Sequence, residues 1–285
     1  MPDKTTLDPK WGLPDGTHDP RVLAHFQALE SDVLITTAPK AGTTWMQQIL
    51  YQMRSGGNTD FDNIDSVVPW LELPRRDKSW RQVLDDYDTL PRPRLFKTHC
   101  TAEQTPGIGT ARIILTVRDP RDCCVSFYHH LINMTDSARD MTGHQRPASF
   151  AAHVETWLKF AAWFRNVKSW WPYRDHEKVL LFRYEDLKRD PGAGVDRIAA
   201  FLDWVVTPEH KAKVLKYSSF DWMKAHDNKF SGQTESGDST FKPGRFIRQG
   251  KVGAYRDLIT PVLEKKILDR AHAELEPECL RFLEI

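Results

Sequence analysis

The sequence predicts an α/β fold: a single domain with a mostly parallel central sheet flanked by helices. Short apolar, β-branched runs of the kind found in buried strands alternate along the chain with segments of helical periodicity. Such alternation is typical of a parallel sheet that helices cover on both faces. The 285 residues contain no internal repeat and no long low-complexity linker. Residues 1–285 are therefore expected to form one domain with a large core.

The elements can be assigned in chain order. Apolar runs predict the strands, and apolar residues at i, i+3, i+4 and i+7 predict the helices between them. Several helices are expected to begin at a capping residue followed by proline. The expected strands are residues 33–37, 94–98, 113–117 and 179–182. The expected helices are 25–30, 43–54, 120–134, one beginning at Ser149, one around 195–202, and two beginning at Thr207-Pro208 and Thr260-Pro261.

Three segments are expected to lie outside the regular elements. Residues 1–20 are polar and rich in Pro, Gly and Asp, which predicts an N-terminal arm. Residues 55–93 are expected to be irregular, and a connection of that length inside a compact domain is usually functional. Residues 227–247 are polar and rich in glycine, which predicts a lid loop over a bound ligand.

Composition narrows the class of protein. The formal net charge of +1 argues against bulk nucleic-acid binding, so any important cations must be placed locally. No apolar run reaches the length of a membrane span, and the first residues lack the apolar core of a secretory signal. The four cysteines show no disulfide framework, which fits reduced thiols and a cytoplasmic location. No spacing of histidine and cysteine suits zinc, so no metal is expected.

The stretch 33–54 forms a candidate anion site. A buried strand enters the turn Ala38-Pro39-Lys40-Ala41-Gly42, and a helix follows from Thr43. The first N–H groups of a helix have no partner within the helix, and the helix dipole favours negative charge there. The turn resembles the phosphate-binding loop of the P-loop nucleotide kinases but lacks the order G-K-[ST], because the lysine precedes the glycine.

Four polar residues stand at or just past the ends of the predicted strands: Lys40, His99, Arg118 and Tyr184. Ligands of parallel sheets bind at the carboxyl ends of the strands, so these side chains are expected at one edge. His99 is the candidate general base, although histidines at such positions also occur as hydrogen-bonded core residues. His129 and His130 are interpreted as structural or pocket-lining.

Six segments, in matching order, resemble the cytosolic-type sulfotransferases, which use 3′-phosphoadenosine 5′-phosphosulfate (PAPS). They are APKAGTTW at 38–45, FKTH at 96–99, VRDPRDCCVSFYHH at 117–130, YEDLKRDP at 184–191, SSFDWMK at 218–224 and FIRQGKVG at 246–253. Each segment alone is a weak signal. The ordered set covers almost the whole chain and is highly specific.

The resemblance implies a set of nucleotide contacts. Lys40, Gly42, Thr43, Thr44 and Trp45 would hold the 5′-phosphosulfate, and Arg118, Ser126, Arg248, Gln249 and Gly250 would hold the 3′-phosphate. Tyr184, Ser218 and Phe220 would contact adenine. Ala41 stands where the family usually has serine, and Gln249 where it has lysine. The first change removes a hydroxyl and the second removes a charge.

The resemblance also implies a metal-free, in-line transfer of a sulfuryl group to a hydroxyl. His99 would take the hydroxyl proton, Lys40 would neutralise the leaving oxygen, and Lys97 would hold sulfonate oxygens. Trp70, His99 and Tyr128 would line a pocket for a small hydrophobic or aromatic acceptor. Residues 55–93 would contribute the wall of that pocket.

Two matters stay open at this level. The family's dimer motif is altered at Pro261 and Lys265, so neither monomer nor dimer is predicted. Two alternative functions also compete with the transferase. One is a P-loop small-molecule kinase, and the other is a catalytically silent regulator that binds PAPS or its product, adenosine 3′,5′-bisphosphate (PAP).

Overall fold

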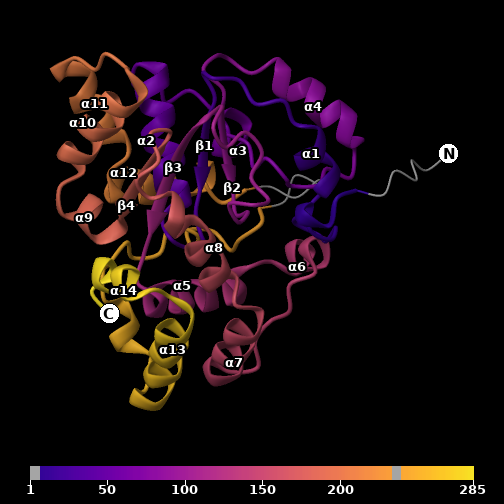
Figure 1. The fold of residues 1–285 in the computed structure, drawn as a ribbon, viewed down its shortest axis with the longest axis vertical. Helices are drawn as coiled ribbons and strands as arrows, with labels where there is room; N and C mark the ends of the chain where they lie inside the picture. Colours follow the sequence, from indigo (N-terminus) through magenta and orange to yellow (C-terminus); the bar gives the residue numbers. More distant parts are fainter. Residues whose placement is uncertain (1–6, 233–238) are drawn as a thin grey trace.

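A four-stranded, all-parallel sheet lies at the centre of the computed structural model, which describes residues 7–232 and 239–285 (Figure 1). The strands are β1 (Val33–Thr36), β2 (Leu95–Thr98), β3 (Arg112–Val117) and β4 (Val179–Arg183), in the order β2-β1-β3-β4. The register pairs Thr36 with Thr98 and Val117 with Arg183. The predicted parallel α/β fold is therefore confirmed. All four carboxyl ends also reach the same edge of the sheet, as predicted.

Helices cover both faces of the sheet, which explains why the strands are apolar except near their ends. On one face, α2, α10 and α11 pack against Ile35, Ile114 and Phe182. On the other face, α1, α4 and the end of α8 pack against Leu34 and Phe96. A third apolar cluster joins α5, α7, α8, α13 and α14 at the carboxyl end of the sheet (Figure 1). The helices are α1 (Pro20–His25), α2 (Thr43–Ser55), α3 (Ile64–Val67), α4 (Trp80–Asp88), α5 (Pro120–Asn133), α6 (Asp136–Thr142), α7 (Phe150–Phe160), α8 (Ala162–Trp170), α9 (Tyr184–Arg189), α10 (Pro191–Leu202), α11 (Pro208–Tyr217), α12 (Phe220–Ala225), α13 (Pro261–Glu274) and α14 (Pro277–Leu283).

The capping chemistry correctly identifies several helix starts. Asp119, Thr207 and Thr260 each accept a backbone hydrogen bond at the N-cap, with proline next in the chain. The predicted helix over 25–30 is wrong, because α1 ends at His25. Its start follows the same rule, since Asp19 accepts from Arg21 N and Pro20 follows it.

Two further predictions need correction. Residues 55–93 are not irregular throughout, because they contain α3 and α4. A capping box between Ser79 and Gln82 begins α4. The helix that begins after Ser149 does not continue unbroken, because Ala161 has a left-handed φ of 51° and separates α7 from α8. In the described residues, no helix is long and apolar enough to cross a membrane.

A buried ion pair joins the strand entrances on the side of the sheet away from the site. Arg94 Nη2 lies 2.6 Å from Asp32 Oδ2, and the two side chains are 2% and 0% exposed. Arg94 also donates to Asp88 Oδ1 at 2.7 Å and to the carbonyl of Gln27 at 2.9 Å. These bonds satisfy the guanidinium and connect β2 with the entrance of β1 and the end of α4.

Candidate active site

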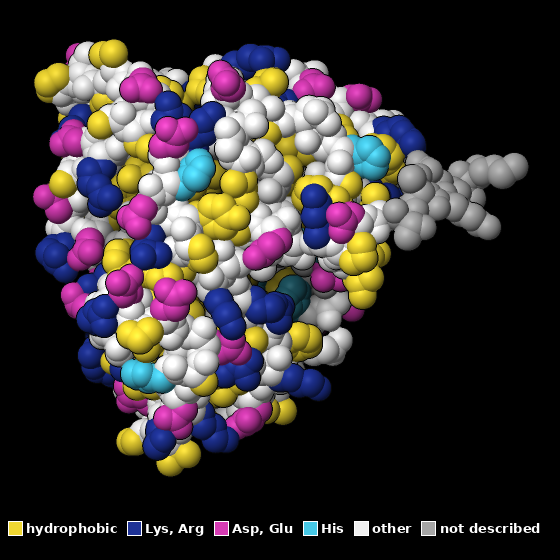
Figure 2. All heavy atoms as spheres, in the orientation of Figure 1, with side chains coloured by type: hydrophobic (Ala, Val, Ile, Leu, Met, Phe, Trp, Pro, Cys, Tyr) yellow, Lys and Arg dark blue, Asp and Glu magenta, His cyan; other side chains and the backbone are white. Residues whose placement is uncertain are grey.

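The polar residues at the strand ends line one cavity of about 950 Å³. Lys40, His99, Arg118 and Tyr184 all contribute to its wall, as the topology predicts. Figure 2 shows a hollow in this face of the molecule, with Lys and Arg side chains gathered beside it. Most of the other predicted site residues also line the cavity: Gly42, Thr43, Thr44, Trp45, Trp70, Lys97, Ser126, Ser218, Phe220, Arg248 and Gly250.

The loop between β1 and α2 is built on two left-handed residues. Lys40 has φ 70° and Gly42 has φ 104°. At Gly42 a side chain has no room, because a Cβ there would lie 2.9 Å from a ring carbon of Tyr184. Glycine is the residue that adopts such a φ without steric cost. The sharp turn starts α2 at Thr43, so that its N-terminus borders the cavity.

Lys40 is a half-buried cation without a carboxylate partner in the described part of the chain. Its Nζ lies 3.1 Å from Nδ1 of His130 and 5.0 Å from the ring centre of Phe246. Burial lowers its pKa from 10.5 to about 8, and the nearby charges of Arg118 and Lys97 add to the shift. An anion bound in the cavity would offset both the desolvation of the ammonium and its repulsion by Arg118 and Lys97.

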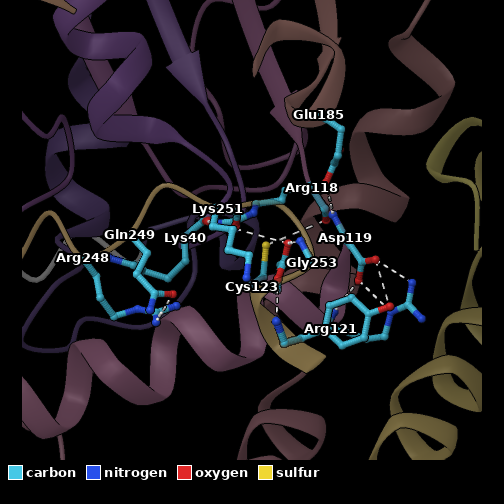
Figure 3. A network of polar contacts seen from close by, with 12 residues as sticks. Lys40, Arg118, Asp119, Arg121, Cys123, Glu185, Arg248, Gln249, Lys251 and Gly253 are labelled. Carbon is cyan, nitrogen blue, oxygen red and sulfur yellow. Dashed lines mark hydrogen bonds and ion pairs between the residues drawn. The ribbon is translucent and has the colours of Figure 1, made fainter. Parts of the chain in front are cut away.

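Arg118 is held at the mouth of β3 by contacts on three sides (Figure 3). It donates to the carbonyl of Lys251 at 3.0 Å, and its guanidinium carbon lies 4.5 Å from the ring centre of Tyr184. Asp122, one helical turn away, forms an ion pair with it at 3.3 Å. Together these contacts fix the direction of the guanidinium.

The segment that carries Arg248 and Gly250 is anchored by Asp122. The buried carboxylate of Asp122 accepts from the backbone N–H of Gly253 at 2.8 Å and of Tyr255 at 3.0 Å. These two bonds bring a distant stretch of the chain over the cavity beside Arg118. Charge-assisted bonds of this kind are stronger than neutral ones.

Aromatic rings form a slot on the side of the cavity next to α2. Trp45 meets Tyr184 edge to face, with ring centres 5.6 Å apart. The indole N–H of Trp45 donates to the carbonyl of Ser218 at 2.9 Å, which holds the ring in place. Lys188 Nζ lies 5.9 Å from the Trp45 ring centre and 5.8 Å from that of Phe220. A flat, apolar group with negative charge nearby fits such a slot.

His99 has the hydrogen bonds of a neutral base. Its Nδ1 lies 2.8 Å from the carbonyl oxygen of Thr37, which can only accept, so Nδ1 carries the proton and Nε2 keeps its lone pair. Its backbone N–H donates to Glu72 Oε1 at 2.9 Å. Burial lowers the pKa of His99 to about 4, against the hydrogen bond to Thr37, which raises it. The side chain is therefore uncharged at neutral pH.

Lys97 lies in the same cavity but already has an anionic partner. Its Nζ forms an ion pair with Asp65 of α3 at 2.9 Å, and it lies 5.1 Å from the ring centre of Trp70. Trp70 in turn meets His99 edge to face, with ring centres 5.0 Å apart. The segment 55–93 thus contributes both a carboxylate and an aromatic ring to the cavity wall.

The structure does not place three predicted site residues on the cavity wall. Ala41 is fully buried in the apolar cluster around Cys123 and Cys124. The side-chain oxygen Oε1 of Gln249 accepts from Arg248 Nη1 at 2.7 Å. Tyr128, expected in the acceptor pocket, instead packs against Phe150 and His153.

Other residues of the cavity wall are not in the predicted site. His130, interpreted as structural or pocket-lining, lines the cavity, and so does Phe127. The two are three positions apart and share one face of α5, from which Tyr128 points away. Lys188, four residues after Tyr184, also borders the cavity. A charged residue at i+4 from a predicted contact was the available signal for Lys188.

Two predicted features remain untested by the geometry. The lid at 227–247 includes residues 233–238, which lie outside the described residues. In its described part, Phe241 pairs with Met134 and borders the cavity. Of the altered dimer motif, Pro261 occupies the first turn of α13 and Lys265 forms an ion pair with Asp269 at 2.7 Å.

Comparisons with known proteins agree with each other. The family model described as "Sulfotransferase domain" matches residues 30–276. Human Sulfotransferase 1E1 is 29% identical over 269 residues, which cover 90% of this chain and 88% of that protein. Mouse Sulfotransferase 1B1 is 31% identical over 252 residues, covering 84% and 80%.

Solved structures show the same fold. A retinol dehydratase in complex with androsterone and inactive cofactor PAP matches with a TM-score of 0.72 at 19% identity, covering 90% of this chain and 85% of that one. A mouse sulfotransferase complexed with PAP matches with a TM-score of 0.69 at 23% identity, covering 91% and 89%.

Proposed function

The chain belongs to the sulfotransferase family, and we propose that it moves a sulfuryl group from PAPS to a hydroxyl group of a small acceptor. One observation carries the proposal: Lys40, Arg118 and Arg248 converge from three elements on the cavity that also holds the free Nε2 of His99. In the described residues, neither Lys40 nor Arg248 has a carboxylate partner. Their charge is thus available for an anionic ligand.

The cavity suits the nucleotide in chemistry as well as charge. The aromatic slot of Trp45, Tyr184 and Phe220 matches an adenine ring, and the cations match its phosphates. Arg118 and Arg248 would hold the 3′-phosphate, with Ser126 and Gly250 beside them. The N-terminus of α2 and Lys40 would hold the 5′-phosphosulfate.

When bound, PAPS supplies the sulfuryl group and a phosphate leaving group. His99 Nε2 takes the proton of the acceptor hydroxyl, while Thr37 keeps the opposite ring nitrogen protonated and oriented. Lys40 stabilises the negative charge that develops on the leaving oxygen. Because Lys97 shares its charge with Asp65, we propose that it contributes less to sulfonate binding than Lys40 does.

The acceptor half of the cavity is mainly aromatic. Trp70, Phe127, Met134 and Phe241 line it together with His130. We propose a hydrophobic, aromatic or alicyclic hydroxyl compound as the acceptor. The segments 55–93 and 227–247 would serve as pocket wall and lid. A cytoplasmic location remains a prediction from the sequence, and the choice between monomer and dimer stays open.

A transfer assay with labelled sulfate tests the function directly. Incubation with labelled PAPS and a panel of phenols and alicyclic alcohols should give labelled sulfate esters without added metal. A P-loop kinase would instead transfer phosphate from ATP. Transfer of label only to sugars or to protein tyrosine would contradict the proposed acceptor class.

His99→Ala separates the enzyme from a silent regulator. The variant should still bind PAP, measured by calorimetry, but should lose transfer by roughly 10²–10⁴-fold, the usual contribution of a general base. His272→Ala, at an exposed position on α13, is the matched control and should retain activity. An intact chain that binds PAP but sulfates no acceptor would favour the regulator.

A further inference from the structure

Three potential metal ligands lie close together near the carboxyl end of β2. His18 comes from the N-terminal segment, Glu72 from the segment between α3 and α4, and Cys100 from just after β2. One ligand atom from each lies within 4.8 Å of the others. Glu72 and Cys100 are only 2% and 3% exposed, and His18 is half-buried. None of the three lines the substrate cavity.

The Glu72 carboxylate lacks a counter-charge among the described residues. Its Oε1 accepts from the backbone N–H of His99. Its buried Oε2 has no backbone, amide or cationic donor in that part of the chain, and the weakly donating Cys100 thiol lies beside the carboxylate. No Lys, Arg or His side chain of those residues forms an ion pair with it. Burying a carboxylate oxygen without a strong hydrogen-bond donor or a cation is unfavourable. A cation bound at this oxygen would remove that cost.

The other two residues provide suitable donor atoms. His18 Nε2 lies 2.6 Å from the carbonyl oxygen of Trp11, which places the ring proton on Nε2 and leaves a lone pair on Nδ1. Metal-bound histidines commonly donate their other ring N–H to a backbone carbonyl, a carboxylate or a water. Cys100 adds a thiol whose pKa is raised by burial and by the neighbouring Glu72.

We propose that His18, Glu72 and Cys100 form a mononuclear Zn²⁺ site. One imidazole nitrogen, one carboxylate oxygen and one thiolate are a ligand set that zinc binds in tetrahedral sites, with water in the fourth position. On binding, the Cys100 thiol releases its proton to solvent as the sulfur–metal bond forms. The sequence does not indicate the site, because its ligands come from three separate segments without a common spacing motif.

The site would have a positioning role beside the transfer chemistry. Glu72 binds the backbone N–H of His99, so a metal at Glu72 would link the N-terminal segment to the base. It would also hold the segment that carries Trp70 against the end of β2, where the Leu71 N–H already bonds to the carbonyl of Lys97 at 2.8 Å. This inference does not depend on the proposed sulfuryl transfer.

Cobalt is the most direct probe, because a cysteine-bound Co²⁺ ion gives a near-ultraviolet charge-transfer band. The purified chain is stripped with a chelator, titrated with Co²⁺, and then titrated with Zn²⁺. We expect the band to saturate at one equivalent per chain, to disappear on addition of Zn²⁺, and to be accompanied by a higher melting temperature. The absence of a saturable band in the folded wild-type chain would overturn the proposal.

Variants assign the ligands. Cys100→Ser should abolish the band. His18→Gln should weaken metal affinity at least roughly tenfold, because losing a metal ligand should cost no less than losing a residue that only hydrogen-bonds to a ligand. Cys279→Ser, at a buried cysteine on α14, is the matched control and should retain the band. Loss of the band in Cys279→Ser but not in Cys100→Ser would refute the assignment. Equal zinc binding by all variants would also refute it.

Discussion

Raising the pH above about 8 should lower kcat/KM, because Lys40 loses its proton there. Its pKa of about 8 lies well below the usual 10.5, because the ammonium is buried beside other cations. The charged form is needed to hold an anionic donor, so activity is present below about pH 8 and is lost above it. In the free enzyme, kcat/KM for PAPS should therefore fall about tenfold per pH unit on the alkaline side.

The size of the shift sets a second expectation. A change from 10.5 to about 8 corresponds to about 3 kcal/mol, at roughly 1.4 kcal/mol per pH unit. A bound anion can return part of that free energy by restoring the preference for the charged form. The alkaline limb of kcat, which reports the complex, should thus lie at higher pH than the limb of kcat/KM.

The assay is the pH dependence of labelled-sulfate transfer to an alicyclic alcohol, whose hydroxyl does not ionise in this range. Lys40→Arg is the informative variant, because a guanidinium stays charged throughout. It should be slower than the wild type, since the planar group replaces a compact ammonium, but it should lack the limb near pH 8. An unchanged limb in Lys40→Arg, or a flat wild-type profile to pH 10, would refute the assignment.

Three substitutions and one matched control test other parts of the structure. Gly250→Ala should weaken PAP binding at least roughly tenfold by calorimetry, because its Cβ would lie 2.7 Å from the ring of Phe220 in the aromatic slot. The matched control is Gly244→Ala, at a similar left-handed φ but with nothing within 4 Å; it should cost about 1 kcal/mol of stability and leave binding unchanged. Arg94→Ala should lower the free energy of unfolding by about 3–5 kcal/mol in denaturant titrations, because it leaves Asp32 buried and unpaired, and a loss below about 1 kcal/mol would contradict this. Ala41→Ser should lower stability by about 1–2 kcal/mol through a buried hydroxyl among apolar side chains, without tightening PAP binding; tighter binding would show that the hydroxyl reaches the nucleotide.

The sequence was informative where a local pattern has one physical outcome. Apolar runs located all four strands, and Asp or Thr followed by Pro located the starts of α5, α11 and α13. It failed where the outcome depends on tertiary contacts. The break at Ala161 carries no glycine or proline, so no local signal separates α7 from α8. The predicted first helix, 25–30, lies too far along the chain, because the true start is the capping residue Asp19 followed by Pro20.

Side-chain direction was the other limit at the site. The segment 117–130 was correctly recognised as a strand end followed by a helix, but the positions that face the cavity depend on how α5 packs. Phe127 and His130 line the cavity, whereas Tyr128 packs against α7. The role of Asp122 was equally invisible, because its partners, the N–H groups of Gly253 and Tyr255, lie far along the chain.

The position of Lys40 before the glycine has a structural reason. With φ 70° at Lys40 and 104° at Gly42, the turn reverses within three residues, and the ammonium enters the cavity from the loop, not from the first turn of α2. A non-glycine residue in this left-handed region costs about 1 kcal/mol or more and persists only where the surroundings enforce it. Here Arg118, itself fixed through Asp122, lies close enough to the Lys40 carbonyl for a 3.5 Å contact. The strained turn and the anchored guanidinium therefore support each other, and they keep two cations close together that would otherwise repel. Because an anion relieves that repulsion, binding an anion recovers the free energy that holding the two cations together costs.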